Sequence, residues 1–155
     1  MNKFQTVALW LVMICLITGC AATAPTKTPL ELQAFQRKEF STTKKVGFAS
    51  TLSVFQDLGY IVRAADIETG LITANSPTKS FVSSGSHMSN TEATAFVEEL
   101  ATNRTFVRLN FVRVDESSSG SGMKRKTDTP IEDPKLYENA FQRIQEAIFV
   151  RTATN

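Results

Sequence analysis

The sequence contains very little of the chemistry on which most enzymes and metal sites depend. Its 155 residues include one histidine, His87, and two cysteines, Cys15 and Cys20, so no cysteine lies beyond residue 20. This excludes a cysteine nucleophile, a thiolate metal site and a disulfide from the rest of the chain, and a single imidazole excludes a zinc site built on paired histidines. We therefore expect no cofactor, no metal ion and no enzymatic activity.

An excess of charge of one sign is also missing. Seventeen lysines and arginines against fifteen aspartates and glutamates leave a formal net charge of +2. A protein that binds nucleic acid through its phosphates needs many clustered cations to displace counterions, so we expect no nucleic-acid partner. Only five residues are proline and 42% are hydrophobic. This is the composition of a globular protein rather than of a disordered chain.

The first twenty residues have the pattern of a secretory signal. In the segment MNKFQTVALWLVMICLITGC, the basic residue Lys3 precedes eleven consecutive apolar residues, Val7 to Ile17. This run is well short of the roughly 20 residues that a helix needs to cross a bilayer. A basic start followed by an apolar run of this length is typical of a signal peptide.

Residues 17–20, Ile-Thr-Gly-Cys, resemble the lipobox at which bacterial lipoproteins are cleaved and acylated. The resemblance implies a lipoprotein signal peptide over residues 1–19 and a membrane anchor on Cys20, made of a diacylglycerol on its sulfur and an acyl chain such as palmitate on its amine. Several acyl chains on one residue give durable membrane attachment. The residue after Cys20 is Ala21 rather than aspartate, and by the rule known for enteric bacteria this implies sorting to the outer membrane. The alternative is an ordinary secreted protein in which Cys20 falls near the cleavage site by chance.

After this anchor we expect a tether over residues 20–29 and a single α+β domain over residues 30–152. The tether is rich in small residues and has two prolines, which favours an extended, flexible chain. Alternating and helical patterns of apolar residues indicate the elements of the domain. The first is a strand over 30–40, followed by a helix that begins at the cap Ser41–Thr43, ends at Gly59 and carries the apolar stripe Phe48, Leu52 and Phe55. Four strands follow, over 60–64, 71–74, 91–100 and 104–111. The last element is a helix that begins at Asp133–Pro134 and carries the apolar stripe Tyr137, Phe141, Ile144 and Ile148.

Three segments give a weaker pattern. Residues 91–100 fit a helix or a strand, and alternating small and apolar residues favour a strand that turns tightly into the next one. Residues 76–90 have no period and many turn-forming residues, which predicts a loop. Residues 115–128 are rich in serine and glycine and then basic, which predicts a mobile loop.

The expected order β-α-β-β-β-β-α suits an antiparallel sheet with two helices on one face. Three segments together, Phe55–Tyr60, Gly70–Ala74 and Asp133–Phe141, resemble a family of small uncharacterised Gram-negative outer-membrane lipoproteins, although Phe55 stands where that family usually has leucine. The order of elements is also similar to the helix-grip domains of the BamC/NlpB lipoprotein. Neither resemblance implies a catalytic residue. The resemblance to the lipoprotein family singles out six residues, and each has a structural interpretation. Asp57 and Gly59 mark a helix end, Gly70 is a turn glycine, Asp133 and Pro134 begin a helix, and Tyr137 is an aromatic residue of the core.

Basic side chains are the best candidates for contact with an anionic partner. Arg104 and Arg108, with Arg63, are expected on the solvent-exposed face of the sheet, where they suit an anionic group or an acidic strand. Lys124, Arg125 and Lys126 are expected on a mobile loop, where they suit phospholipid head groups. The simpler interpretation of both groups is ordinary surface charge.

His87 and the carboxylate pairs do not suggest a catalytic site. His87 lies alone in a polar segment without a serine elbow such as GxSxG. The acidic pairs Glu98–Glu99 and Asp115–Glu116 are adjacent, and neighbours on a strand point to opposite faces, so they do not converge on one bond.

The sequence therefore predicts a lipid-anchored outer-membrane protein that faces the periplasm and binds or scaffolds envelope components without catalysis. Its expected contacts are the membrane, through Cys20, and an envelope protein. The alternative is a carrier that holds a small apolar or anionic ligand in a pocket between the sheet and the last helix.

Overall fold

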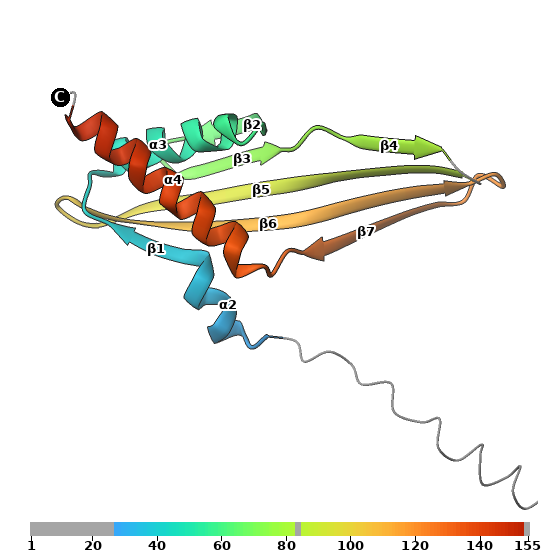
Figure 1. The fold of residues 1–155 in the computed structure, drawn as a ribbon, viewed down its shortest axis with the longest axis horizontal. Helices are drawn as coiled ribbons and strands as arrows, with labels where there is room; N and C mark the ends of the chain where they lie inside the picture. Colours follow the sequence, from blue (N-terminus) through green and yellow to red (C-terminus); the bar gives the residue numbers. More distant parts are fainter. Residues whose placement is uncertain (1–26, 83–84, 154–155) are drawn as a thin grey trace, which may run out of the picture.

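The fold is built around one long β-hairpin (Figure 1). In the computed structural model, which describes residues 27–82 and 85–153, strands β5 (Gly85–Ala101) and β6 (Arg104–Ser119) pair antiparallel along almost their entire lengths. Each strand extends for about 50 Å at the usual rise per residue. The other elements are α2 (Pro29–Gln36), β1 (Arg37–Phe40), α3 (Lys44–Asp57), β2 (Ile61–Asp66), β3 (Leu71–Asn75), β4 (Lys79–Val82), β7 (Lys124–Pro130) and α4 (Pro134–Ala153).

Short strands flank the hairpin differently at its two ends. At the end that carries the turn between β5 and β6, the strand order is β1-β6-β5-β3-β2, and every neighbouring pair is antiparallel. Toward the other end, β4 pairs with β5 and β7 pairs with β6. We call the first part the body, residues 27–75, 93–111 and 131–153, and the second part the arm, residues 76–82, 85–92 and 112–130.

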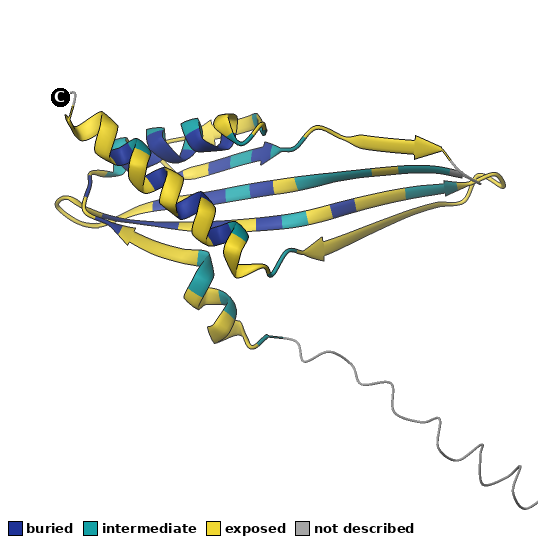
Figure 2. Ribbon diagram, viewed as in Figure 1, coloured by how far each residue is buried: buried dark blue, intermediate teal, exposed yellow. Residues whose placement is uncertain are grey.

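The described helices form a layer on the body and none on the arm. Helices α3 and α4 cover one face of its sheet, and the buried residues concentrate beneath them (Figures 1 and 2). Both predicted stripes are confirmed, because Phe48, Phe55, Tyr137, Phe141, Ile144 and Ile148 are buried and Leu52 packs against them. Alternate residues of β6 face the helices and are fully buried: Thr105, Val107, Leu109 and Phe111. The predicted α+β class, with an antiparallel sheet, is therefore confirmed.

The predicted helix ends of α3 and α4 are also confirmed. The Thr43 hydroxyl accepts the Val46 N–H at 3.4 Å at the start of α3, and Gly59 follows its end with a φ of +82°. At the start of α4, the Asp133 carboxylate accepts the Lys135 N–H at 3.0 Å. Side-chain acceptors satisfy backbone N–H groups that a helix start leaves without partners.

The prediction of one strand over residues 30–40 is wrong for most of that segment. Residues 29–36 form α2, and only residues 37–40 form the strand β1. A capping box decides this: the Thr28 hydroxyl accepts the Glu31 N–H at 3.3 Å, and the Glu31 carboxylate accepts the Thr28 N–H at 2.7 Å, with Pro29 at the first helical position. This cap outweighs the short alternation of apolar residues that suggested a strand.

The two predicted loops are wrong as well. Residues 76–90 contain β4 and the start of β5, and residues 115–128 contain the end of β6 and most of β7. These strands carry few apolar residues because no helix covers them, so the pattern that reveals a half-buried strand is missing. The predicted strand over 91–100, which turns tightly into the next strand, is confirmed.

Candidate functional site

The predicted lipid attachment site, Cys20, lies outside the residues that the structure describes, and so do the predicted signal peptide and residues 20–26 of the tether. None of the helices within residues 27–82 and 85–153 is both long and apolar enough to cross a membrane. The same residues contain no cluster of three histidine, aspartate, glutamate or cysteine side chains that could hold a metal ion.

The structure separates the predicted basic residues into two groups. Arg104 begins β6 in the body, whereas Lys124 pairs with Ser118 near the other end of the same strand. Ser118 lies fourteen positions after Arg104 on one extended strand, which corresponds to roughly 45 Å. A single small ligand cannot contact both groups. The third arginine of the predicted stripe, Arg63, is exposed and lies where the pairing of β2 with β3 shifts between Val62 and Ala64.

Arg108 lies on the helix-free face of the body, as predicted. It shares this face with Phe106, because alternate residues of a strand point the same way. The Arg37 guanidinium lies 4.2 Å from the centre of the Phe106 ring and that of Arg108 lies 6.0 Å from it, while Phe96 contacts the same ring edge to face at 6.0 Å. Arg108 therefore belongs to a small arginine–aromatic cluster, in which Phe106 is only 4% exposed.

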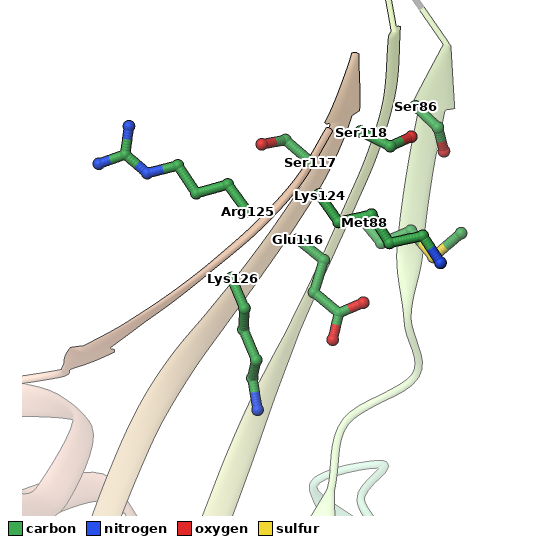
Figure 3. A pocket seen from close by; sticks show the side chains of 8 residues that line it. All are labelled: Ser86, Met88, Glu116, Ser117, Ser118, Lys124, Arg125 and Lys126. Carbon is green, nitrogen blue, oxygen red and sulfur yellow. The ribbon is translucent and has the colours of Figure 1, made fainter. Parts of the chain in front are cut away.

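Lys124, Arg125 and Lys126 lie on strand β7 rather than on a mobile loop. Their side chains alternate, so Lys124 and Lys126 point to one face of the arm and Arg125 points to the other (Figure 3). Lys126 contacts Asp128 at 3.8 Å, and within residues 27–82 and 85–153 Lys124 and Arg125 form no ion pair. The three cations therefore lie on both sides of one exposed sheet edge.

Each face of the arm carries a shallow hollow. The hollow on the face of Lys124 and Lys126 measures about 360 Å³, and two rows of paired residues line it: Ser86, Ser118 and Lys124 in one row, and Met88, Glu116 and Lys126 in the next (Figure 3). On the other face, a hollow of about 390 Å³ follows the row Phe81, His87, Ser117 and Arg125. Both hollows are open surface, not enclosed cavities.

His87 contacts an aromatic ring rather than a catalytic partner. Its imidazole stacks on the ring of Phe81, with centroids 4.9 Å apart and planes inclined by 12°. The neighbouring acidic residues do not converge on one point, because Asp115 pairs with Ser89 and Glu116 pairs with Met88 on the opposite face. On this face, the stacked rings of Phe81 and His87 lie in the same row as Arg125, with Ser117 between His87 and Arg125.

Sequence analysis missed the role of the Tyr137 hydroxyl, which connects three parts of the body. It donates a hydrogen bond to the Ile131 carbonyl at 2.9 Å and accepts hydrogen bonds from the Phe111 N–H and the Gln36 side chain, both at 3.3 Å. Burial raises the pKa of Tyr137 above its usual value, and burial followed by the nearby Tyr137 does the same for the pKa of Tyr60. The contacts of Tyr137 are structural, because its hydroxyl is surrounded by the chain's own groups.

Two exposed carboxylates have pKa values below the usual range for local reasons. The Thr28 N–H, and then the Thr28 hydroxyl, lower the pKa of Glu31 in the capping box of α2. The Glu68 N–H, and then the Thr69 hydroxyl, lower the pKa of Asp66 in the turn between β2 and β3. These shifts come from caps and turns, not from a functional site.

Gly70, which the family resemblance singled out, lies in the turn between β2 and β3, where there is no space for a side chain. Gly70 has a φ of +76°, and a Cβ atom added to it would lie 2.0 Å from the Val97 carbonyl oxygen. Its own carbonyl accepts the Val97 N–H at 2.8 Å. Two other residues singled out by the family resemblance also have structural roles, since Asp57 is the last residue of α3 and Pro134 is the first residue of α4.

The apolar side chains of the arm are a further feature that sequence analysis missed. Phe81 and Val82 on β4 are 64% and 84% exposed, Met88 on β5 is 46% exposed and Met123 in the turn before β7 is 76% exposed. The sequence signal was the pair Phe81–Val82 inside a segment that was otherwise assigned as a polar loop. Val114 is the one buried residue of the described arm.

Comparisons with known proteins add little to this geometry. No family model matches the chain, and no curated protein matches its sequence. Among solved structures, the chain is similar to a DUF4468 family protein from Bacteroides ovatus, with a TM-score of 0.39 and 12% sequence identity over 72% of this chain and 84% of the other.

Proposed function

We propose that this protein is a lipid-anchored, periplasm-facing outer-membrane protein that binds or scaffolds envelope components and has no catalytic role. The observation that carries this proposal is the arm, a four-stranded sheet that extends past the helical layer, so that none of the described helices covers either of its faces (Figure 1). Exposed apolar side chains that gather in one place are typical of contact surfaces. The anchor follows from the lipobox-like residues at Cys20.

The edge formed by β4 is the part of the arm best suited to another protein chain. Among the described residues, strand β4 pairs with β5 alone, so the backbone groups along its other side can pair with an added strand. Its side chains Phe81 and Val82 point to opposite faces and are both largely exposed. An added strand would cover apolar surface on both faces at once.

The alternative function, a carrier with a pocket between the sheet and the last helix, has less support. The space beneath α4 is filled by side chains, since Phe111, Tyr137 and Ile144 are fully buried there. A hollow near Phe35, Arg37 and Phe141 lies at the margin of α4, and it opens to the surface. A ligand at that place would lie against the protein rather than inside it.

Photocrosslinking in intact envelopes tests the proposed binding surface. A photoreactive phenylalanine analogue replaces Phe81 in the arm or, as a matched control, Phe149 on α4, which is 72% exposed in the body. We expect a discrete crosslinked protein from position 81 and none from position 149. Equal yields from the two positions, or no product from position 81, would contradict the proposal.

The proposed anchor has a separate test. Replacement of Cys20 by serine removes the sulfur that would carry the diacylglycerol, so Cys20→Ser should abolish palmitate labelling and leave a precursor or a periplasmic product. Normal palmitate incorporation in this variant would show that the anchor is not at Cys20.

A further inference from the structure

Strand β7 lies on the same long edge of the sheet as the point where the described chain begins. Both β1 and β7 pair with β6 on its outer side, and α2 leads directly into β1 (Figure 1). Lys27 lies seven positions after Cys20, a reach of at most about 25 Å. A lipid on Cys20 would therefore hold this edge, rather than the opposite edge, close to the membrane.

The two long edges of the sheet differ in charge. Strands β1 and β7 carry five cations against two carboxylates, Glu39 and Asp128. Strands β2 and β4, on the opposite edge, carry two cations, Arg63 and Lys79, against one carboxylate, Asp66. The edge nearer to the proposed anchor is thus the one that suits an anionic surface.

The cations of β7 are arranged to contact a surface that approaches this edge. Lys124 and Lys126 lie on one side of the strand and Arg125 on the other, and all three are exposed. Long cationic side chains on both sides of an edge can reach head-group phosphates together. Met123, 76% exposed in the turn before β7, places an apolar side chain at the end of the same edge.

We propose that the β7 edge, through Lys124, Arg125, Lys126 and Met123, docks on the anionic phospholipid surface of the membrane that holds the anchor. This inference rests on the proposed anchor at Cys20. Docking would fix the orientation of the molecule, since β7 and β4 are the two outer strands of the arm. It would turn β4, with Phe81 and Val82, away from the membrane and toward the periplasm.

The test uses the acylated chain, reconstituted into vesicles, with Met123→Cys carrying an environment-sensitive dye. One set of vesicles contains equal amounts of phosphatidylglycerol and phosphatidylethanolamine, and the other contains phosphatidylcholine alone. Flotation with the vesicles measures whether the acylated chain attaches to the membrane. The emission of the dye measures whether the β7 edge contacts the membrane surface. The new thiol would be the only free one, because the sequence has no other cysteine than Cys15, in the predicted signal peptide, and Cys20, the proposed site of acylation.

We expect the chain to float with both vesicles and the dye to report an apolar surrounding only with phosphatidylglycerol. High salt should reverse the shift, because it screens exposed charges. A triple variant, Lys124→Gln with Arg125→Gln and Lys126→Gln, should lower the equilibrium constant for docking by roughly fivefold for each cation removed. A control with the same loss of charge elsewhere, Arg63→Gln with Lys79→Gln and Arg104→Gln, should keep the shift.

The other outcomes overturn the proposal in distinguishable ways. A chain that does not float with either vesicle refutes the anchor and, with it, the docking. A chain that floats while the dye reports water in both vesicles refutes the docking alone. A shift of equal size with phosphatidylcholine, or one that appears only after envelope proteins are added, assigns the β7 edge to a different contact and also overturns the proposal.

Discussion

The body and the arm share the strands β5 and β6, yet they bury their residues differently. In the body, Ala93, Ala95 and Val97 alternate with more exposed residues because α3 and α4 cover one face. In the arm, the continuations of the same strands carry mostly serine, threonine and charged residues, and none of the described helices covers either face. Secondary structure in the arm therefore depends on hydrogen bonds between strands, whereas in the body it depends also on apolar burial, which usually supplies most of the stability.

Removal of an aromatic side chain should have the largest effect, and only in the body. Phe141 is 4% exposed and its ring lies 6.3 Å from that of Phe40, so Phe141→Ala leaves a cavity that should cost about 3–5 kcal/mol of unfolding free energy. Phe81 is 64% exposed, so Phe81→Ala should cost less than about 1 kcal/mol. Urea unfolding of both variants measures the difference. Similar losses would show that the arm has a core of its own.

Two glycines with the same backbone conformation extend the comparison. Gly70 in the body has a φ of +76° and no room for a Cβ beside Val97, so Gly70→Ala should cost about 2–4 kcal/mol. Gly122 in the arm has a φ of +81° but no atom within 4 Å of a Cβ, so Gly122→Ala should cost only the backbone strain of about 1–2 kcal/mol. Thermal unfolding ranks the two variants. The reverse order would contradict the steric role of Gly70.

Alkaline pH should destabilise the body and leave the arm without a direct effect, because both tyrosines, Tyr60 and Tyr137, lie in the body. Burial raises their pKa values, so the unfolded chain loses these protons at lower pH than the folded chain does. The unfolding free energy should therefore stay level below a pH of about 9 and fall as the pH rises past about 10. Urea unfolding across this range measures the effect.

The variant Tyr137→Phe provides the control for this pH dependence. It should cost about 1–2 kcal/mol at neutral pH, because the Ile131 carbonyl and the Phe111 N–H lose a hydrogen-bond partner. It should also make the alkaline decline shallower. An unchanged decline would assign the effect to another group.

The smallest effect is expected at Ser50 on α3. Its hydroxyl is fully buried and, within the described part of the chain, has no hydrogen-bond partner. Ser50→Ala should leave the stability unchanged or raise it by up to about 1 kcal/mol. The neighbouring Thr51 donates to the Gly47 carbonyl at 2.8 Å, so Thr51→Val should lower the stability by about 1 kcal/mol. A loss at Ser50 as large as that at Thr51 would mean that Ser50 has a partner.

The candidate surfaces were only partly predictable. Lys124, Arg125 and Lys126 stood out in the sequence as a cluster of cations, but their division between two faces follows from the pairing of β7 with β6. Their distance from Arg104 and Arg108 follows from the unbroken length of β6. Phe81 and His87 are six residues apart in the chain, and they meet only because β4 folds back on β5.

The sequence by itself determined most elements of the body, with the exception of α2, which forms where a strand was predicted. The apolar stripes on α3 and α4 and the alternation in β6 show which side chains are buried on folding. A helical period of apolar residues indicates a helix, and strict alternation indicates a strand. Only the tertiary structure decided the arm, where β4 and β7 add to the hairpin through backbone hydrogen bonds. Backbone groups are the same in almost every residue, so pairing without burial leaves no pattern in the side chains. The three hydrogen bonds of the Tyr137 hydroxyl were also decided only by the tertiary structure, because its partners Gln36, Phe111 and Ile131 come together only in the folded chain.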